Sequence, residues 1–346
     1  MSIIQIHPDF RLQGQSFKDR DSFLNFVSDN FFDSYEFLRQ LLDGSDNIVA
    51  YTSGSTGKPK QIILSKKALL ASAEATGQFF NLFSKTTALN CLSSDFIAGK
   101  MMWVRALHLG WHLEVVAPDK KPLLDKNDSF DFCAMVPMQV RNSLERILQI
   151  KKLIIGGAVL SKSLESLLKE IPIEVYQTYG MTETITHIAV KQLLKGQQNN
   201  YQALPNVKFS VDNRNCLLID APRVSSNNIV TNDVVQLHSP TSFSWLGRYD
   251  NVINSGGVKL FPEQIENKLA PLINVPFFIS SISDIMLGNK LILVLESDKK
   301  IKNSTSLWEK ARLSKFEVPK EIYYLPKFSY TKSQKIERQK TLRKLM

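Results

Sequence analysis

Short apolar runs alternate with longer amphipathic stretches over the first two thirds of the chain. The runs have the length of buried strands and the stretches have room for helices. The predicted strands cover residues 47–51, 61–64, 88–92, 113–117, 152–157 and 173–180. One predicted helix begins after Ser65 as its N-cap, others cover 99–109, 138–149 and 161–170, and residues 1–46 hold one or two more. Strands that alternate with helices favour an α/β domain on a largely parallel sheet.

The pattern changes after about residue 247. A turn-rich segment is followed by a helix that Pro262 can begin, strands at 275–282 and 290–296, a helix at 304–313 and a strand at 321–325. This is a smaller α+β unit of ordinary domain size. We therefore expect two domains, residues 1–247 and residues 248–346.

Composition and charge narrow the class of protein. Of the 346 residues, 43% are apolar and 22% are charged, which is typical of a globular protein and argues against disorder or coiled coil. The formal net charge is +10, and most of the surplus lies after residue 249. A basic surplus favours anionic partners, which include nucleic acid, an acidic membrane surface and small phosphorylated molecules.

The cysteines and the N-terminus predict a protein of a reducing compartment. Three well-separated cysteines without a CxxC pair argue against a disulfide framework or a zinc knuckle. The N-terminus does not read as a signal peptide, and no apolar run approaches the roughly 20 residues that cross a bilayer. We expect a cytoplasmic protein without membrane insertion.

A loop rich in hydroxyls, glycines and lysines follows the first of these strands. Residues 49–60 read VAYTSGSTGKPK, and their backbone N–H groups, hydroxyls and cations can surround phosphate oxygens. This is not a Walker A loop, because Pro59 follows Lys58 and the glycine spacing is too short. The alternative is a flexible surface turn.

The order TSGSTGKPK resembles the phosphate loop of the acyl-adenylate-forming superfamily, which includes acyl-CoA synthetases. Further segments resemble that family's motifs in the family's order: residues 155–160 along the adenine, 179–183 as the YGxTE motif, 231–233 at the ribose and 247–250 as the hinge. Lys335 stands where the family keeps its catalytic lysine, although Gln334 replaces a usual glycine. The resemblance implies an adenylate-forming fold with a large, shortened N-terminal α/β domain and a small mobile C-terminal α+β lid.

The resemblance also implies a two-step reaction that uses ATP, Mg²⁺ and CoA. A carboxylate becomes a good acyl donor once it is attached to the α-phosphate, and cations near phosphorus stabilise the charge that develops there. The implied catalytic residues are Lys335, Thr182 and Glu183, with Glu183 as the Mg²⁺ ligand. The implied ATP- and AMP-binding residues are Thr52, Ser53, Gly54, Ser55, Thr56, Gly57, Lys58, Gly156, Gly157, Ala158, Thr178, Tyr179, Gly180, Met181, Thr182, Asp233 and Arg248. The implied hinge is Asp250, and the implied CoA channel consists of Ser255, Gly256 and Gly257.

These residues also have ordinary structural explanations. Thr182 and Glu183 suit the first turn of a helix. An Asp that follows a strand, such as Asp233, is commonly a solvated turn residue. The basic residues around Lys335 suit a solvated tail.

Two histidines have the spacing of metal ligands on a helix. His108 and His112 lie four residues apart, but Gly110 intervenes and no acidic third ligand accompanies them. We assign both to packing and capping.

Within the superfamily, the chain most resembles the short o-succinylbenzoate-CoA ligases of menaquinone biosynthesis. The segments that carry this resemblance are residues 96–102, 136–139, 179–189 and 253–262. That substrate has a second carboxylate, which needs a cationic or hydrogen-bonding partner because an unpaired buried charge is costly. The candidate pocket residues are Phe96, Ile97, Lys100, Thr186 and His187. The alternative for Lys100 is an exposed helix residue.

Three functions are compatible with the sequence. The first is an acid-CoA ligase for o-succinylbenzoate, with small molecules and no nucleic acid as its partners. The second adenylates another aromatic acid or loads a carrier protein. The third is a basic nucleic-acid-binding protein, which would interleave aromatic with basic residues. The tail offers only Phe328 and Tyr330 for this, so we rank it last. The sequence leaves the oligomeric state open.

Overall fold

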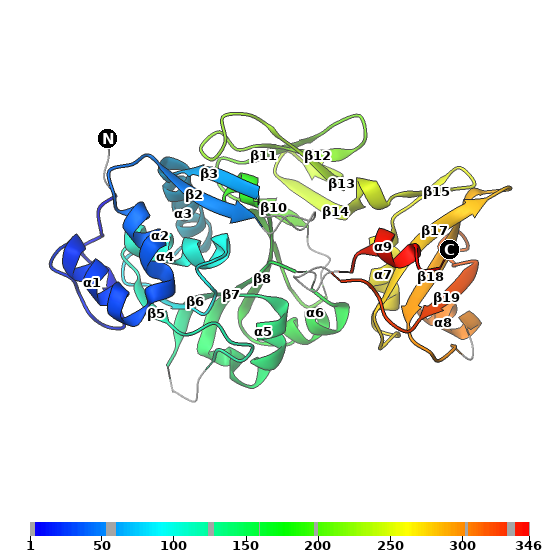
Figure 1. Cartoon of the computed structure of the whole chain (residues 1–346), viewed down its shortest axis with the longest axis horizontal. Helices are drawn as coiled ribbons and strands as arrows, with labels where there is room; N and C mark the ends of the chain where they lie inside the picture. The colour runs from blue at the N-terminus through cyan, green and yellow to red at the C-terminus, as the bar shows by residue number, and fades with distance from the viewer. Residues whose placement is uncertain are drawn as a thin grey trace.

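The computed structural model describes residues 4–52, 60–123, 128–158, 160–196, 200–301, 304–330 and 336–345. A twelve-stranded sheet runs through the part of the chain before residue 249, and a three-stranded sheet forms the C-terminal part (Figure 1). Within the described residues, none of the helices is long and apolar enough to cross a membrane.

One half of the large sheet is parallel. Its strands are, in spatial order, β1 (Arg11–Leu12), β5 (His112–Val115), β4 (Thr87–Asn90), β6 (Phe130–Met135), β7 (Ile150–Ile155) and β8 (Glu174–Gly180). The strands predicted at 88–92, 113–117, 152–157 and 173–180 are confirmed to within a few residues. The sequence analysis missed β6, an apolar strand at the centre of this half.

The other half of the sheet is antiparallel, so the prediction of a largely parallel sheet is wrong there. Its strands are β9 (His187–Gln192), β10 (Tyr201–Ala203), β14 (Ser242–Arg248), β13 (Ile229–Ser239), β12 (Cys216–Asp220) and β11 (Lys208–Val211). The connections between β11, β12, β13 and β14 contain no crossover helix, and a parallel connection would need one.

The strands predicted at 47–51 and 61–64 exist but do not join the large sheet. They are β2 (Asn47–Thr52) and β3 (Lys60–Ser65), which pair with each other as a separate antiparallel hairpin.

Helices cover both faces of the parallel half. Four of them share one apolar core: α1 (Arg20–Asn30), α2 (Phe32–Leu41), α3 (Lys66–Phe80) and α4 (Ile97–Leu109). A second core contains α5 (Pro137–Asn142), the 3₁₀ turn η1 (Leu144–Gln149) and α6 (Lys162–Leu168). Ser65 is the N-cap residue of α3, as predicted, although its side chain does not make the capping hydrogen bond.

Gly110 ends α4, which separates His108 from His112. Gly110 has a left-handed φ of 73°, and His112 already belongs to β5. His108 instead lies 3.1 Å from Glu74, through Nε2 and Oε1. The two histidines therefore do not share a helix face, in agreement with their assignment to packing.

The C-terminal elements match the predicted order. The hairpin β15 (Ile253–Ser255) and β16 (Val258–Leu260) precedes α7 (Pro262–Leu269), which has Pro262 at its first position. The sheet order is β17 (Phe277–Asp284), β18 (Gly288–Glu296) and β19 (Glu321–Leu325), accompanied by α8 (Ser304–Lys310) and α9 (Arg338–Leu342). In Figure 1 these elements lie together at the end of the molecule opposite α1. The domain boundary at residue 247 stays a prediction.

Candidate active site

The ends of β7 and β8 bring two of the candidate nucleotide segments into contact. Gly156 to Ala158 follow β7, and Thr178 to Gly180 close β8. The Thr178 hydroxyl donates to the carbonyl of Ile155 at 3.1 Å. A Cβ at Gly156 would collide with this hydroxyl, so the close approach of the two segments requires glycine there. The carboxyl ends of parallel strands are where α/β folds commonly bind ligands.

The YGxTE segment folds as a tight turn rather than as the start of an α-helix. Thr182–Thr184 form the 3₁₀ turn η2, and the N–H of Met181 donates to Thr184 Oγ1 at 2.9 Å. Glu183 is exposed, with no ion pair to another described residue. The described residues contain no group of three potential metal ligands. Mg²⁺ commonly takes one or two carboxylates with phosphate oxygens and waters, and Glu183 fits that role.

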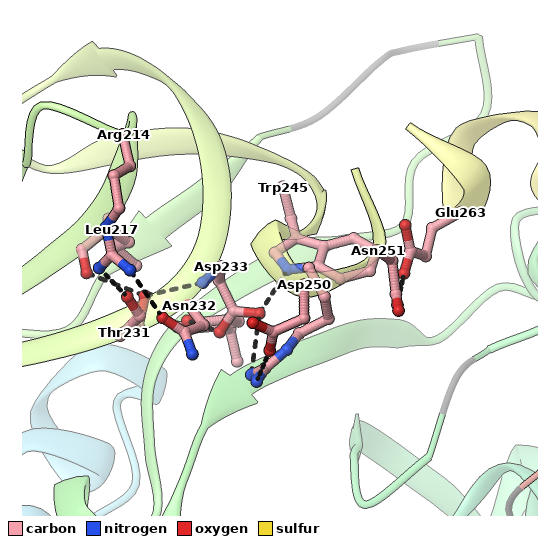
Figure 2. Close-up of polar contacts among 11 residues, drawn as sticks. Arg214, Leu217, Thr231, Asn232, Asp233, Trp245, Asp250, Asn251 and Glu263 are labelled. Atoms are coloured by element: carbon pink, nitrogen blue, oxygen red, sulfur yellow. Dashed lines mark hydrogen bonds and ion pairs between the residues drawn. The ribbon is translucent and has the colours of Figure 1, made fainter. Parts of the chain in front are cut away.

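The Asp233 carboxylate is buried and held by two donors. Asp233 is 7% exposed, and Tyr179 Oη donates to its Oδ2 at 2.6 Å. Trp245 Nε1 donates to Asp233 Oδ1 at 3.1 Å (Figure 2). Burial and the Asp233 charge raise the pKa of Tyr179, so its hydroxyl stays a donor. Arg248 pairs with Asp233 across β13 and β14, with 3.7 Å between Nη1 and Oδ1. Asp233 is therefore an oriented acceptor and not a solvated turn residue.

The predicted hinge is a short 3₁₀ turn between the two sheets. Asp250 lies in η3 (Tyr249–Asn251), and its Oδ2 is 3.4 Å from Arg248 Nη2. Asn251 Nδ2 donates to Glu263 Oε1 at 2.5 Å (Figure 2). From α7, Gln264 Nε2 donates to the carbonyl of Leu246 at 2.8 Å. These bonds join the C-terminal elements to β14.

The candidate CoA residues form the tip of a hairpin. Ser255 ends β15, and Gly256 and Gly257 form the turn with φ values of 56° and 79°. Two consecutive left-handed residues favour glycine at both positions. The N–H of Gly256 donates to the carbonyl of Leu287 at 2.9 Å, so the turn is held against the β17–β18 hairpin.

The pocket candidates divide into two groups. Phe96 is 59% exposed and precedes Ile97, the first residue of α4, while Lys100 Nζ donates to the carbonyl of Asp95 at 3.3 Å. Thr186 and His187 belong together, with 3.4 Å between Thr186 Oγ1 and His187 Nδ1. No contact between described side chains joins Lys100 to His187.

Sequence analysis missed Arg105, a cation inside the core. Arg105 is 1% exposed, and its partners are neutral: Thr76 Oγ1 at 3.3 Å from Nε and Met102 Sδ at 3.7 Å from Nη1. Nη2 has no hydrogen-bond partner among the described residues. Burial lowers the pKa of Arg105 to about 9. The signal was a single arginine within the apolar run MMWVRAL.

His187 lies beside this guanidinium. Its Nε2 is 3.4 Å from the same Thr76 hydroxyl. Burial, and secondarily the Arg105 charge, hold the pKa of His187 well below its usual value, so its ring is neutral. Arg105, Thr76 and His187 thus form a buried cluster with a net positive charge.

Several predicted residues lie outside the described part of the chain. They are Ser53, Gly54, Ser55, Thr56, Gly57, Lys58 and Lys335, together with the side chain of Thr52. Tyr330 and Ile336, on either side of the Lys335 segment, form an antiparallel bridge. Arg338 Nη2 is 2.8 Å from Glu266 Oε2, so this arginine is not part of a solvated tail.

Known proteins share the sequence and the fold. The 2-succinylbenzoate–CoA ligase of Escherichia coli (strain K12) is 27% identical over 293 residues, which cover 80% of this chain and 64% of that protein. The ligase of the same name from Staphylococcus epidermidis (strain RP62A) is 25% identical over 325 residues, 84% of this chain and 68% of its own. The chain thus spans about two thirds of the length of these curated relatives.

Two solved structures extend the comparison. An acyl-CoA synthetase (AMP-forming)/AMP-acid ligase II-like protein from Dyadobacter fermentans is 38% identical, with a TM-score of 0.61 over 91% of this chain and 94% of that one. The o-succinylbenzoate coenzyme A synthetase of Bacillus subtilis, in complex with ATP and magnesium ion, is 18% identical, with a TM-score of 0.72 over 91% and 78%. The fold is that of the adenylate-forming enzymes. Residues 36–224, more than half of the chain, match the profile described as AMP-binding enzyme, and the chain therefore belongs to that family.

Proposed function

We propose that this protein is an ATP- and Mg²⁺-dependent acid-CoA ligase that adenylates o-succinylbenzoate and then forms o-succinylbenzoyl-CoA. Family membership supports the adenylation step. The names of the E. coli and S. epidermidis relatives support the acid and the acceptor. The B. subtilis complex supports ATP and magnesium as reactants.

The Arg105 guanidinium, which has no anionic partner in the described part of the chain, is the observation that carries the choice of acid. A buried cation without an anionic partner costs several kcal/mol, and a carboxylate from outside the chain would remove that cost. Only an acid with a second carboxylate has one left after the first is activated. His187 and the Thr76 hydroxyl lie beside Arg105 and can add hydrogen bonds to that carboxylate.

The nucleotide residues divide the work of binding ATP. Asp233, oriented by Tyr179 and Trp245, accepts hydrogen bonds from the ribose hydroxyls, and Arg248 contacts the ribose or the α-phosphate. Gly156 lets its segment approach Thr178 closely, and the adenine lies along these two segments in this proposal. These roles use the conformation that the side chains already have, so little ordering is required on binding.

The reacting centre lies beyond the end of β8 in this proposal. Thr182 would donate to phosphate, and Glu183 would hold Mg²⁺, which would supply positive charge to offset that of the phosphate oxygens. Lys335 bridges the carboxylate and the α-phosphate during adenylation. The C-terminal elements then turn at Asp250 and present the Ser255–Gly257 hairpin to the pantetheine arm of CoA.

An acid panel tests the proposal directly. Pyrophosphate release is measured with o-succinylbenzoate, benzoate, succinate, a long-chain acid and 4-oxo-4-phenylbutanoate, which lacks only the ring carboxylate. We expect o-succinylbenzoate to exceed 4-oxo-4-phenylbutanoate by at least about thirtyfold in kcat/KM, because the latter leaves Arg105 unpaired. Equal use of both acids would overturn the choice of substrate and leave the adenylation chemistry intact.

The alternatives have distinct outcomes. Release of AMP that does not depend on CoA but does depend on an added carrier protein would favour carrier loading. Preference for another aromatic acid would favour the alternative that the protein is an adenylating ligase for that acid. Nucleic-acid binding with a strong salt dependence, together with no pyrophosphate release from any acid, would favour the basic binding protein.

A further inference from the structure

Arg214 connects three separate segments of the chain. Its Nε donates to Asp212 Oδ2 at 2.8 Å within the turn between β11 and β12. Nη1 donates to Asn232 Oδ1 at 3.1 Å and Nη2 to the carbonyl of Thr231 at 3.3 Å, both on β13 (Figure 2). Its guanidinium carbon lies 5.0 Å from the centre of the Tyr249 ring in η3. One planar group thus contacts a turn, a strand and the hinge.

The turn holds this guanidinium in place. Asp212 Oδ1 accepts from the N–H groups of Arg214 and Cys216, at 2.8 and 2.9 Å. The hydrogen bond that Arg214 donates to Asp212 raises the pKa of Arg214, which keeps the group charged. A guanidinium can donate in its plane and stack on an aromatic ring with its face, whereas an ammonium cannot make both contacts in this geometry.

The β13 residues that Arg214 contacts lie directly before Asp233, the proposed ribose-binding residue. Thr231 and Asn232 immediately precede Asp233, and the Asp233 N–H donates to Thr231 Oγ1 at 3.1 Å. The same hydroxyl donates to the carbonyl of Leu217 at 2.9 Å. A shift of Arg214 therefore displaces the backbone that carries the Asp233 carboxylate.

The contact of Arg214 with the Tyr249 ring connects the same guanidinium to the proposed hinge. Tyr249 and Asp250, the expected pivot, belong to the same 3₁₀ turn, which the bond from the Val252 N–H to the Tyr249 carbonyl closes, so a hinge movement that unwinds this turn changes the position of the Tyr249 ring relative to the guanidinium. Arg248 also links Asp233 with Asp250, but it already has a role toward the nucleotide. Arg214 has no such role in the proposal, and its contacts join the β11–β12 turn and β13 to the Tyr249 ring.

We propose that Arg214 is a positioning residue that couples nucleotide binding at Asp233 to the orientation of the hinge at Tyr249. This inference rests on the proposed function. A nucleotide that favours the present position of Asp233 also favours the stacked Tyr249, and rotation of the hinge weakens nucleotide binding by the same factor.

The test measures AMP binding to the full-length protein by calorimetry. Tyr249→Leu removes the ring without touching Asp233, and we expect it to weaken AMP binding roughly two- to fivefold, the size of a cation–π contact at an exposed site. Arg214→Lys should weaken it at least as much, whereas Tyr249→Phe, which keeps the ring, should bind AMP as the wild type does. The matched control is Arg39→Lys, which changes an exposed arginine paired only with Glu36, at 2.8 Å between Nη2 and Oε1.

A second readout separates coupling from simple loss of structure. The rate of thioester formation from preformed acyl-adenylate is compared with the rate of pyrophosphate release. Tyr249→Leu should change the ratio of the two rates, whereas a purely structural defect would lower both together.

The outcomes distinguish the two hypotheses. If the wild type binds AMP and Tyr249→Leu binds it equally well, the coupling is wrong and the proposed function stands. If the wild type does not bind AMP, the proposed function fails and the coupling with it. Should Tyr249→Leu fail to fold, Arg214→Lys decides, and an AMP affinity equal to that of the wild type overturns the coupling.

Discussion

Replacement of Arg105 by methionine should stabilise the unliganded protein and weaken its binding of a dicarboxylic acid. Methionine fills a similar length of the core and carries no charge. Removal of a buried ionic group in favour of apolar side chains commonly raises the free energy of unfolding by about 1–4 kcal/mol. Burial lowers the pKa of Arg105 from its ordinary value to about 9, which corresponds to an upper limit of about 5 kcal/mol.

The advantage of the variant should depend on pH. The pKa of Arg105 is lower in the folded protein than in the unfolded chain, so folding disfavours the charged form of Arg105. The loss of stability that this charge causes is therefore at its full size below about pH 9. As the pH rises above 9, the folded protein loses this proton more readily than the unfolded chain, and the penalty decreases. Urea unfolding at pH 7 and pH 10 should therefore show a larger difference between variant and wild type at pH 7.

Substrate binding should move in the opposite direction. Loss of one partner from a buried, hydrogen-bonded charge pair costs about 2–5 kcal/mol, which is a rise in KM for o-succinylbenzoate of roughly thirtyfold to several thousandfold. The control is Arg39→Met, an exposed position at which both quantities should stay unchanged. The reasoning is refuted if Arg105→Met is less stable than the wild type at pH 7 and has the same KM for the acid. Lys100→Ala tests the second candidate cation for this carboxylate. We expect KM for o-succinylbenzoate to rise by less than about tenfold, because the Lys100 ammonium already donates to the Asp95 carbonyl.

Three further predictions concern the metal ligand, the hinge and the N-terminal helices. Glu183→Gln should slow pyrophosphate release at least about tenfold across a Mg²⁺ titration. Because the Glu183 side chain is exposed, the thermal midpoint of unfolding should stay within about 2 °C of the wild type. An unchanged rate would argue against a metal role for Glu183. Gly247→Ala places a Cβ 2.5 Å from Glu263 Oε2, so we expect the free energy of unfolding in urea to fall by about 1–3 kcal/mol. The double variant with Glu263→Ala should recover most of this loss. An unchanged free energy of unfolding would show that α7 can move aside. Asp43→Asn leaves Lys66, 4% exposed, without its carboxylate and should cost about 1–3 kcal/mol at pH 7. Since the hydrogen bond from Lys66 holds the pKa of Asp43 well below its usual value, this difference should be complete above about pH 5 and decrease as the pH falls toward the folded pKa, and a difference that is the same at pH 5 and at pH 2 would contradict the assignment.

Local patterns were sufficient to predict most elements of the fold. The helix after Ser65 and the helix at Pro262 begin at the predicted residues. The fixed φ of proline suits a first helical position, whereas Ser65 marks the start of its helix without making a capping hydrogen bond. The strands β9 to β14 were not predicted, and neither was the direction of their pairing. Apolar runs indicate a strand, but its partner depends on the length and path of the connections and on which faces are left to be covered.

The candidate site likewise contains residues that sequence motifs predicted and residues that only the structure revealed. The Tyr179–Asp233 hydrogen bond joins residues 54 positions apart, and each end could be named from its own motif. Arg105 and Arg214 belong to no motif. Their importance appears only in the fold, where Arg105 is buried without an anionic partner among the described residues and Arg214 lies between β13 and Tyr249.

The sequence by itself determined the order of the elements, the family motifs and the chemistry that those motifs imply, because caps, periodicity and short motifs are properties of neighbouring residues. Only the tertiary structure decided that half of the large sheet is antiparallel, that Asp233 is a buried acceptor and that Arg105 is a buried cation with no counter-charge among the residues that the structure describes. The physical reason is that solvation and charge compensation depend on what the rest of the chain places around a group, and no local pattern records that environment.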